Sequence, residues 1–166
     1  ISTRDWSSDV CSSDLVDMLP EKRAFAERLG ATHVVDPAAG DAAEQVRAIV
    51  PGGVDVAFEA LGHVDVIDQA FRSVRDGGTT VLIGQPAMGV KAGFDVYDAT
   101  QFEHSILGTN MGGIVPALEI PRLARLAARG RVDLHPLVTH TLPLDEINEA
   151  VELTKSGQAG RVVIVP

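Results

Sequence analysis

Polar residues and glycines follow the apolar, strand-like runs of this sequence, where open parallel sheets bind their ligands. Asp17 is the most informative of them, because an acid after such a strand can accept hydrogen bonds from both hydroxyls of an adenosine ribose and its charge repels a 2′-phosphate. A strand-end or helix-capping aspartate fits the same position equally well. The other strand ends of this kind are Asp36, Glu59 with Gly62, Gly84, and Thr109 with Asn110.

Side chains that bind metals are few and scattered. The single cysteine, Cys11, cannot form an intramolecular disulfide, and it excludes a cysteine-rich zinc module. A reducing, cytoplasmic location is therefore the default expectation. The histidines, which show no ligand spacing, are His33, His63, His104, His135 and His140. We expect no zinc site within this chain.

Short β-rich runs alternate with helical patterns from residue 15 onward, without a hairpin dipeptide between them. The expected strands end or lie at 15–17, 33–35, 54–58, 79–83, 105–109, 137–141 and 161–165. The expected helices lie at 20–29, 42–50, 64–74, 115–129 and 144–155, and 76–78 is expected to be a turn. This alternation predicts an α/β fold with a parallel sheet covered by helices on both faces.

Composition excludes several classes of function. Lys and Arg total 14 against 23 Asp and Glu, a net charge of −9. An acidic chain without a basic run is unsuited to nucleic acid or to an anionic membrane surface. The longest aliphatic stretches are of strand length, far below the ~20 residues that span a bilayer, and the first residues do not resemble a secretory signal.

The segment 1–14 differs from the rest of the chain. It contains the near-repeat Ser-Ser-Asp-Val at 7–10 and Ser-Ser-Asp-Leu at 12–15, without helical or strand periodicity. We interpret it as a non-native or disordered tail, similar to a translated synthetic linker. Because the chain has no initiating Met, we expect it to begin within a longer protein.

Five runs of sequence carry a resemblance to a known family. They are VDMLPEKRAFAERLGATHVVDP at 16–37, GVDVAFEALG at 53–62, GGTTVLIG at 77–84, LPLDEINEA at 142–150 and GRVVI at 160–164. In this order, over 15–166, they closely resemble zinc-dependent medium-chain alcohol dehydrogenases. The resemblance implies a partial dinucleotide-binding (Rossmann) domain at 15–114 and, at 115–166, a segment that packs on a catalytic domain outside this chain.

The resemblance also implies roles for individual residues, which we state as expectations. Asp17 would bind the adenosine ribose with Lys22 beside it, and Arg161 would pair with the pyrophosphate. Leu61 and Gly62 would pass close to the adenosine half of the cofactor. The backbone positions that would hold the nicotinamide carboxamide are Ile83, Thr109 and Met111, with Gly84 leaving room for the ring.

Part of the family pattern lies outside these residues: the domain that carries the zinc ligands, the first strand of the sheet and the Gly-x-Gly-x-x-Gly turn. We therefore expect a partial doubly wound parallel sheet, Rossmann-like, that lacks its first strand and its glycine-rich loop. In the family that strand lies between the second and fourth strands, so its loss leaves two unpaired inner edges. Unpaired edges recruit other chains, and we expect the isolated chain to be marginally stable.

The function that the resemblance implies is cofactor binding in an enzyme that transfers a hydride between an alcohol or aldehyde and NAD, with zinc held by ligands outside this chain. No residue of the chain itself is expected to be catalytic. Assembly into a homo-oligomer is expected through the strand at 105–109, which starts at Ser105. Two alternatives stay open: a zinc-free quinone or enoyl reductase, against which Asp17 argues, and a non-catalytic nucleotide-binding or truncated product.

Overall fold

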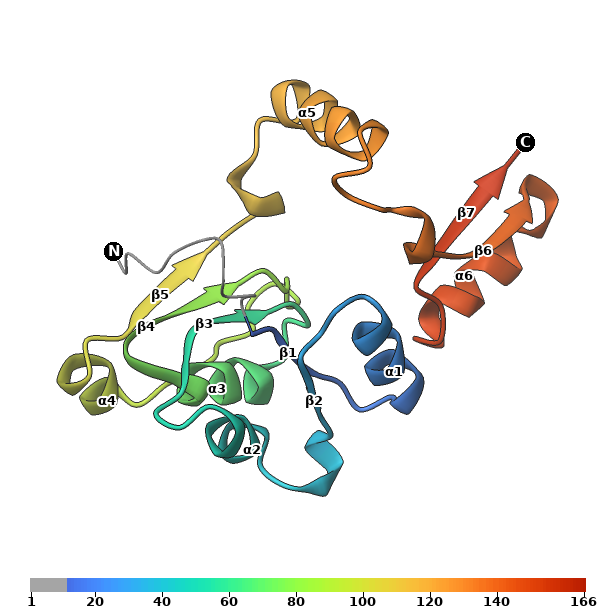
Figure 1. Ribbon diagram of the computed structural model, residues 1–166. Coiled ribbons are helices and arrows are strands. Elements are labelled where there is room, and N and C mark those ends of the chain that lie inside the picture. The colour runs from blue at the N-terminus through green and yellow to red at the C-terminus, as the bar shows by residue number, and fades with distance from the viewer. Residues whose placement is uncertain (1–11) are drawn as a thin grey trace. The chain divides into compact units, whose positions relative to one another are not determined.

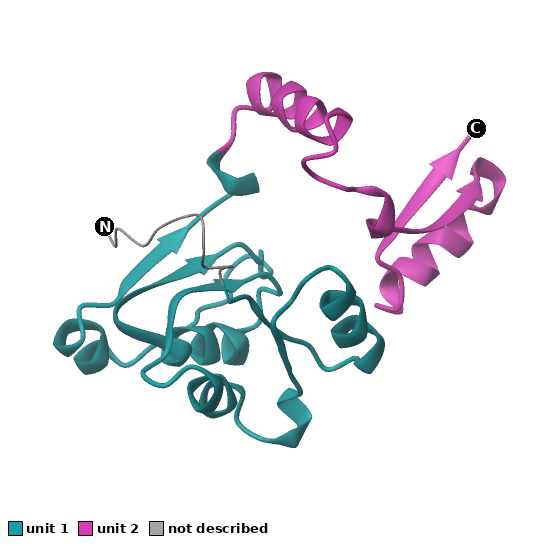
Figure 2. Cartoon of the chain, in the orientation of Figure 1, with its two compact units in different colours: residues 1–113 teal, residues 114–166 magenta. Residues whose placement is uncertain are grey.

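The computed structural model describes residues 12–166, so Cys11 and most of the predicted tail lie outside the described residues. The chain divides into two compact units, residues 1–113 and 114–166 (Figure 2). Strands and helices alternate along both units, and every strand pair is parallel. The predicted α/β class is confirmed.

Two separate parallel sheets form the first unit (Figure 1). Strand β1 (Asp14–Val16) pairs with β2 (His33–Val35), and β3 (Val54–Glu59), β4 (Val74–Leu82) and β5 (Ser105–Gly108) form the second sheet in that order. Strands β1 and β3 each pair on one side only within the described residues. The sheet is therefore partial, as expected for one that lacks a strand between β1 and β3.

Four α-helices connect these strands. They are α1 (Pro20–Arg28), α2 (Ala42–Ile49), α3 (Val64–Ser73) and α4 (Val96–Gln101), and a 3₁₀ turn, η1, spans Pro37–Ala39. Helix α3 packs on one face of the β3–β5 sheet, where Ile67 and Phe71 are buried. Side chains on the opposite face, such as Phe58 and Leu107, are exposed, as strand alternation requires of a sheet covered on one side.

Helix α2 connects the two sheets through an apolar cluster. Its residues Ala42 and Val46 pack with Val35 of β2. Ile49, at the end of α2, and Val54, at the start of β3, lie against the same cluster. Ala42, Val46 and Ile49 share one face of α2 because they are spaced four and three residues apart. Burial of this cluster holds together two sheets that share no strand pairing.

An ionic network joins α2 to α3. Asp41 caps α2 by accepting the Glu44 N–H at 3.0 Å, and the Arg72 guanidinium donates to both Asp41 oxygens and to Asp68. The pKa of Asp41 is lowered below its usual value. The largest cause is its hydrogen bonding with Arg72, and the next is the hydrogen bond from the backbone N–H of Glu44. The same pairs raise the pKa of Arg72.

Two elements differ from the sequence predictions. Helix α4 was not predicted; Asp95 caps it by accepting the N–H groups of Tyr97 and Asp98. Strand β4 begins at Val74 and continues through the expected turn at 76–78. Its partners explain this, because Val74 pairs with Val54 and Thr79 pairs with Val56, so that 75–78 form an irregularity within one strand.

The start of β1 lies inside the segment 1–14, which its composition sets apart as a tail. Asp14 pairs with His33, and Ser13 exchanges backbone and side-chain hydrogen bonds with Thr32. Residues 13 and 14 therefore belong to the fold, because the edge of β2 gives their backbone groups partners.

The second unit contains a parallel strand pair and two helices. Strand β6 (Val138–Pro143) pairs with β7 (Arg161–Val165), and α6 (Ile147–Lys155) packs on both. Helix α5 (Pro116–Ala128) precedes them. Short 3₁₀ turns lie at Met111–Gly113 (η2, at the end of the first unit), His135–Leu137 (η3) and Leu144–Glu146 (η4). Among the described helices, none is long and apolar enough to cross a bilayer.

Candidate functional site

The turns that follow β3, β4 and β5 converge at the carboxyl edge of their sheet. The backbone N–H groups of Ile83 and Gly84 donate to the carbonyl oxygen of Glu59 at 2.7 and 2.9 Å. The N–H of Thr109 donates to the carbonyl oxygen of Leu82 at 3.0 Å. The structure therefore brings Leu61, Gly62, Ile83, Gly84 and Thr109 to one edge, with Met111 two residues further along the chain.

Glycine is required at two of these positions. A Cβ atom on Gly84 would overlap the backbone nitrogen of Gly62 and would lie 2.6 Å from the carbonyl carbon of Leu61. Gly62 has φ +80°, and a Cβ there would lie 2.9 Å from the backbone of Gln85 and Pro86. The two turns thus pack backbone to backbone at the carboxyl edge of the sheet.

Side chains at this edge are open to solvent. Leu61 and Met111 are 71% and 70% exposed, and Ile83 is 44% exposed. Met111 has φ +51°, a left-handed conformation that a non-glycine residue seldom adopts, between Asn110 and Gly112. Apolar side chains and an unusual backbone conformation at the carboxyl ends of parallel strands are properties of a binding edge.

In the sequence, Glu59 is recognisable only as the polar end of a strand. The structure places this carboxylate at 1% exposure, with Oε1 accepting the N–H groups of Leu61 at 2.8 Å and Gly62 at 2.7 Å. The signal available in the sequence is an acid that closes an apolar strand three residues before a glycine. Glu59 is the group that shapes the β3 turn.

Asp17 directly follows β1, in the other sheet, and Lys22 lies five residues further along the chain. Asp17 Oδ1 accepts the Leu19 N–H at 2.8 Å. The N-cap residue of α1 is Leu19, so Asp17 braces the turn before the helix and is not its cap. Lys22 is half-buried in the first turns of α1.

Arg23 fixes the backbone that carries Asp17. Its guanidinium donates to the carbonyl oxygens of Asp17 at 2.6 Å and Met18 at 2.9 Å, and it pairs with Asp36 at 2.8 Å. Because these bonds hold the main chain at Asp17 and Met18, they also fix the point from which the Asp17 carboxylate extends.

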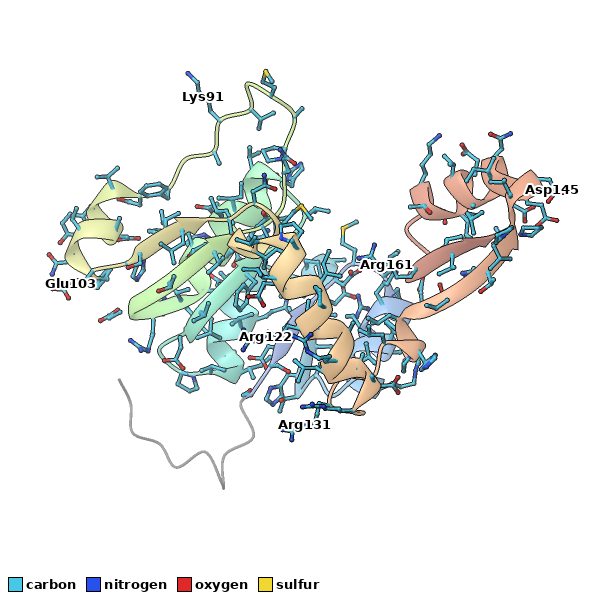
Figure 3. The ribbon with its side chains drawn as sticks, turned by 90° about the horizontal axis from the view of Figure 1, so that it is seen from above. Lys91, Glu103, Arg122, Arg131, Asp145 and Arg161 are labelled. Atoms are coloured by element: carbon cyan, nitrogen blue, oxygen red, sulfur yellow. The ribbon has the colours of Figure 1, made fainter. Side chains whose placement is uncertain are left out.

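Arg161 begins β7 in the second unit, where its side chain is exposed (Figure 3). Its carbonyl oxygen accepts the hydroxyl of Thr139 at 3.3 Å.

The part of the chain that the structure describes does not fit a zinc ion. It contains no group of three or more His, Cys, Asp or Glu side chains that could hold a metal. His33 Nδ1 lies 2.7 Å from Asp14 Oδ1, and the His104 ring packs edge-on against Phe71 with centroids 5.0 Å apart. Neither histidine belongs to a ligand set within the described residues, although both ring nitrogens of His104 are buried without a hydrogen-bond partner there.

The comparisons with known proteins agree with this geometry. Residues 15–129 match the model of a protein family described as "Zinc-binding dehydrogenase". The chain belongs to the zinc-binding dehydrogenase family. This zinc-binding dehydrogenase chain is 33% identical to Alcohol dehydrogenase-like 2 of Arabidopsis thaliana, over 90% of its own length and 39% of that protein. It is also 33% identical to S-(hydroxymethyl)glutathione dehydrogenase of Haemophilus influenzae, over 90% of its length and 40% of the relative.

Solved structures extend the similarity to the fold. The benzyl alcohol dehydrogenase of Acinetobacter calcoaceticus superposes with a TM-score of 0.89 at 30% identity, covering 93% of this chain and 42% of that one. A zinc-binding dehydrogenase from Sinorhizobium meliloti bound to NADP gives 0.79 at 30% identity, covering 95% and 46%. The chain thus spans about two fifths of the length of its curated relatives, and its fold is part of theirs.

Proposed function

We propose that this chain is the cofactor-binding part of a zinc-dependent alcohol dehydrogenase, which transfers a hydride between an alcohol or aldehyde and NAD. The zinc ligands would come from outside the described residues, which hold no ligand set of their own. NAD supplies the hydride acceptor when it is bound. The residues of this chain bind and orient it, and we propose that the chain alone is inactive.

The observation that carries the proposal is the backbone contact between Gly62 and Gly84. It lies at the carboxyl ends of adjacent parallel strands, where open α/β sheets bind ligands. Because neither turn tolerates a Cβ toward the other, a side chain at Gly62 or Gly84 would displace the turns at this edge. Membership of the zinc-binding dehydrogenase family supports the proposal that the ligand of this edge is a nicotinamide cofactor.

We propose one role for each candidate residue. Asp17 accepts hydrogen bonds from the adenosine ribose, with Lys22 beside it, and Leu61 and Gly62 pass along the adenosine half. Ile83, Thr109 and Met111 offer backbone groups to the nicotinamide carboxamide, and Gly84 leaves room for the ring. Arg161, from the second unit, pairs with the pyrophosphate through its forked guanidinium.

Preference for NAD over NADP rests on Asp17. Its Oδ1 is held by Leu19 and its turn by Arg23, so its charge is fixed where a 2′-phosphate would approach. Replacement of Asp17 by Ser in the full-length protein that contains this chain removes this charge. We expect the ratio of kcat/KM for NAD to that for NADP to fall about 10- to 100-fold, the value of one or two hydrogen bonds to a charged group.

The matched control is Asp65→Ser, which removes an acid that is 77% exposed near the start of α3. We expect this variant to keep the cofactor ratio of the unaltered protein. A protein that prefers NADP before any substitution would favour the zinc-free reductase alternative. A protein that binds neither cofactor would refute the proposed function.

We also propose that the chain assembles through β5. This strand pairs with β4 along one edge, and its other edge is unpaired within the described residues. The side chain of Leu107 is 55% exposed on the open face of the sheet. An unpaired edge with an apolar side chain beside it favours pairing with a second copy.

A further inference from the structure

Glu59 contacts both turns of the candidate site through different atoms. Its carboxylate oxygen Oε1 accepts the N–H groups of Leu61 and Gly62, and its backbone carbonyl oxygen accepts those of Ile83 and Gly84. These four residues are the candidate cofactor residues of β3 and β4. One residue therefore fixes two turns that belong to different strands.

The side-chain bonds of Glu59 are of a strong kind. Both distances, 2.8 and 2.7 Å, lie at the short end of the range for N–H···O hydrogen bonds, and the residue is 1% exposed. Water does not compete with such bonds when they are buried, so they hold the turn rigidly. These bonds therefore keep the Gly62 backbone in contact with that of Gly84. If the β3 turn moved, this contact would be lost.

The other carboxylate oxygen makes the presence of a glutamate here costly. Oε2 is buried and has no hydrogen-bond partner within residues 12–166. A buried carboxylate with an unpartnered oxygen lowers stability, so stability alone does not favour an acid at this position. What a glutamate provides here, and an apolar side chain of the same size does not, is an oxygen, Oε1, that accepts the Leu61 and Gly62 amides.

We propose that Glu59 is a positioning residue of the cofactor site, whose buried carboxylate orients the β3 turn against the β4 turn so that both receive the nicotinamide cofactor. This inference rests on the proposed function, since it takes the ligand of the two turns to be that cofactor. Glu59 does not touch the ligand in this account. It acts through the amides of Leu61 and Gly62.

The test compares Glu59→Met with Glu59→Gln in the full-length protein. Met is unbranched and of similar volume but offers the two amides only a weakly accepting thioether sulfur, whereas Gln keeps one oxygen that can accept both. We expect Glu59→Met to raise the KM for the cofactor about tenfold or more while kcat changes less, and Glu59→Gln to stay within about threefold of the unaltered protein.

Thr80→Val is the control for burial alone. Thr80 is also 1% exposed and lies on β4 of the same sheet. Its Oγ1 has no hydrogen-bond partner among residues 12–166, so its side chain holds neither turn. Its replacement should leave the KM for the cofactor unchanged. Melting temperatures of all three variants separate loss of fold from loss of positioning.

Two results would overturn the inference: Glu59→Met with a cofactor KM no higher than that of Thr80→Val, or Glu59→Gln as impaired as Glu59→Met. If Glu59→Met does not fold, Glu59→Gln still decides, because a rise in KM beyond about threefold at unchanged melting temperature contradicts the proposed role of Oε1. Absence of cofactor binding by the unaltered protein would instead refute the proposed function, and the inference with it.

Discussion

Replacement of Gly84 by alanine tests the contact on which the candidate site depends. The new methyl group would meet the backbone of Leu61 and Gly62, which are parts of the chain with no rotamer to change. The carbonyl carbon of Leu61 would lie 2.6 Å from it, whereas ordinary van der Waals contact begins near 3.4 Å. The β3 turn must therefore retreat by about 0.8 Å or more, against the two bonds from Glu59 that hold it.

The size of the effect follows from this overlap. Adding a methyl group to a packed site costs roughly 1–3 kcal/mol, and an overlap with backbone belongs at the upper end because no side chain can move aside. About 3 kcal/mol corresponds to roughly a 100-fold change in an equilibrium constant. This free energy must appear as weaker cofactor binding, as lower stability of the folded protein, or as a division between the two.

The assay is a titration of the full-length protein with NADH, followed by fluorescence, together with urea denaturation of the same samples. Gly93→Ala is the matched control, since Gly93 lies in the same unit, has no positive φ and has no atom within 4 Å of the position that a Cβ would take. We expect Gly93→Ala to bind and unfold as the unaltered protein does. If Gly84→Ala matched Gly93→Ala in both measurements, the backbone contact between the two turns would be refuted.

Two further predictions concern stability and assembly. The pKa of Asp41 is lowered in the folded state by Arg72 and by the Glu44 N–H, so its contribution to stability is present above its unfolded value near 3.8 and is lost as the pH falls through the lower folded value. Asp41→Asn should therefore lower the urea midpoint at pH 7, and the difference from the unaltered protein should shrink below about pH 4; an equal difference at pH 7 and pH 3 would contradict this. Leu107→Asp places a charge on the open face beside the β5 edge and should lower the oligomeric state measured by sedimentation, whereas an unchanged sedimentation coefficient would exclude β5 as the interface.

Periodicity and glycine placement predicted most of the elements. The strands at 33–35 and 161–165 have their predicted bounds. Helix α4 escaped prediction because six residues are too short to show a helical period, although Asp95 offered a capping signal. The extension of β4 through 75–78 depends on pairing between Val54 and Val74, which local sequence does not reveal.

Some features of the candidate site, too, can be predicted from the sequence, and others cannot. Gly62 and Gly84 are visible in the sequence because glycines that follow strands mark close approach of backbone. The bonds of Glu59 and Arg23 are not, because each depends on how a turn aims its amides or carbonyls once neighbouring strands have paired. The roles of Asp17, Lys22 and Arg161 remain predictions that the experiments on the cofactor address.

The separation of β1–β2 from β3–β5 has a consequence for the dynamics of the first unit. Since no strand pairing joins the two sheets in the described residues, cooperativity between them passes through the apolar face of α2. Amide protons of β1 and β2 can then exchange with solvent by opening of the α2 cluster around Val46, while the β3–β5 ladder stays closed. The β1–β2 sheet, which Asp17 follows, would then behave as a separate foldon that is ordered by α2. A strand paired with both β1 and β3, or a ligand bound by both sheets, would couple it to β3–β5.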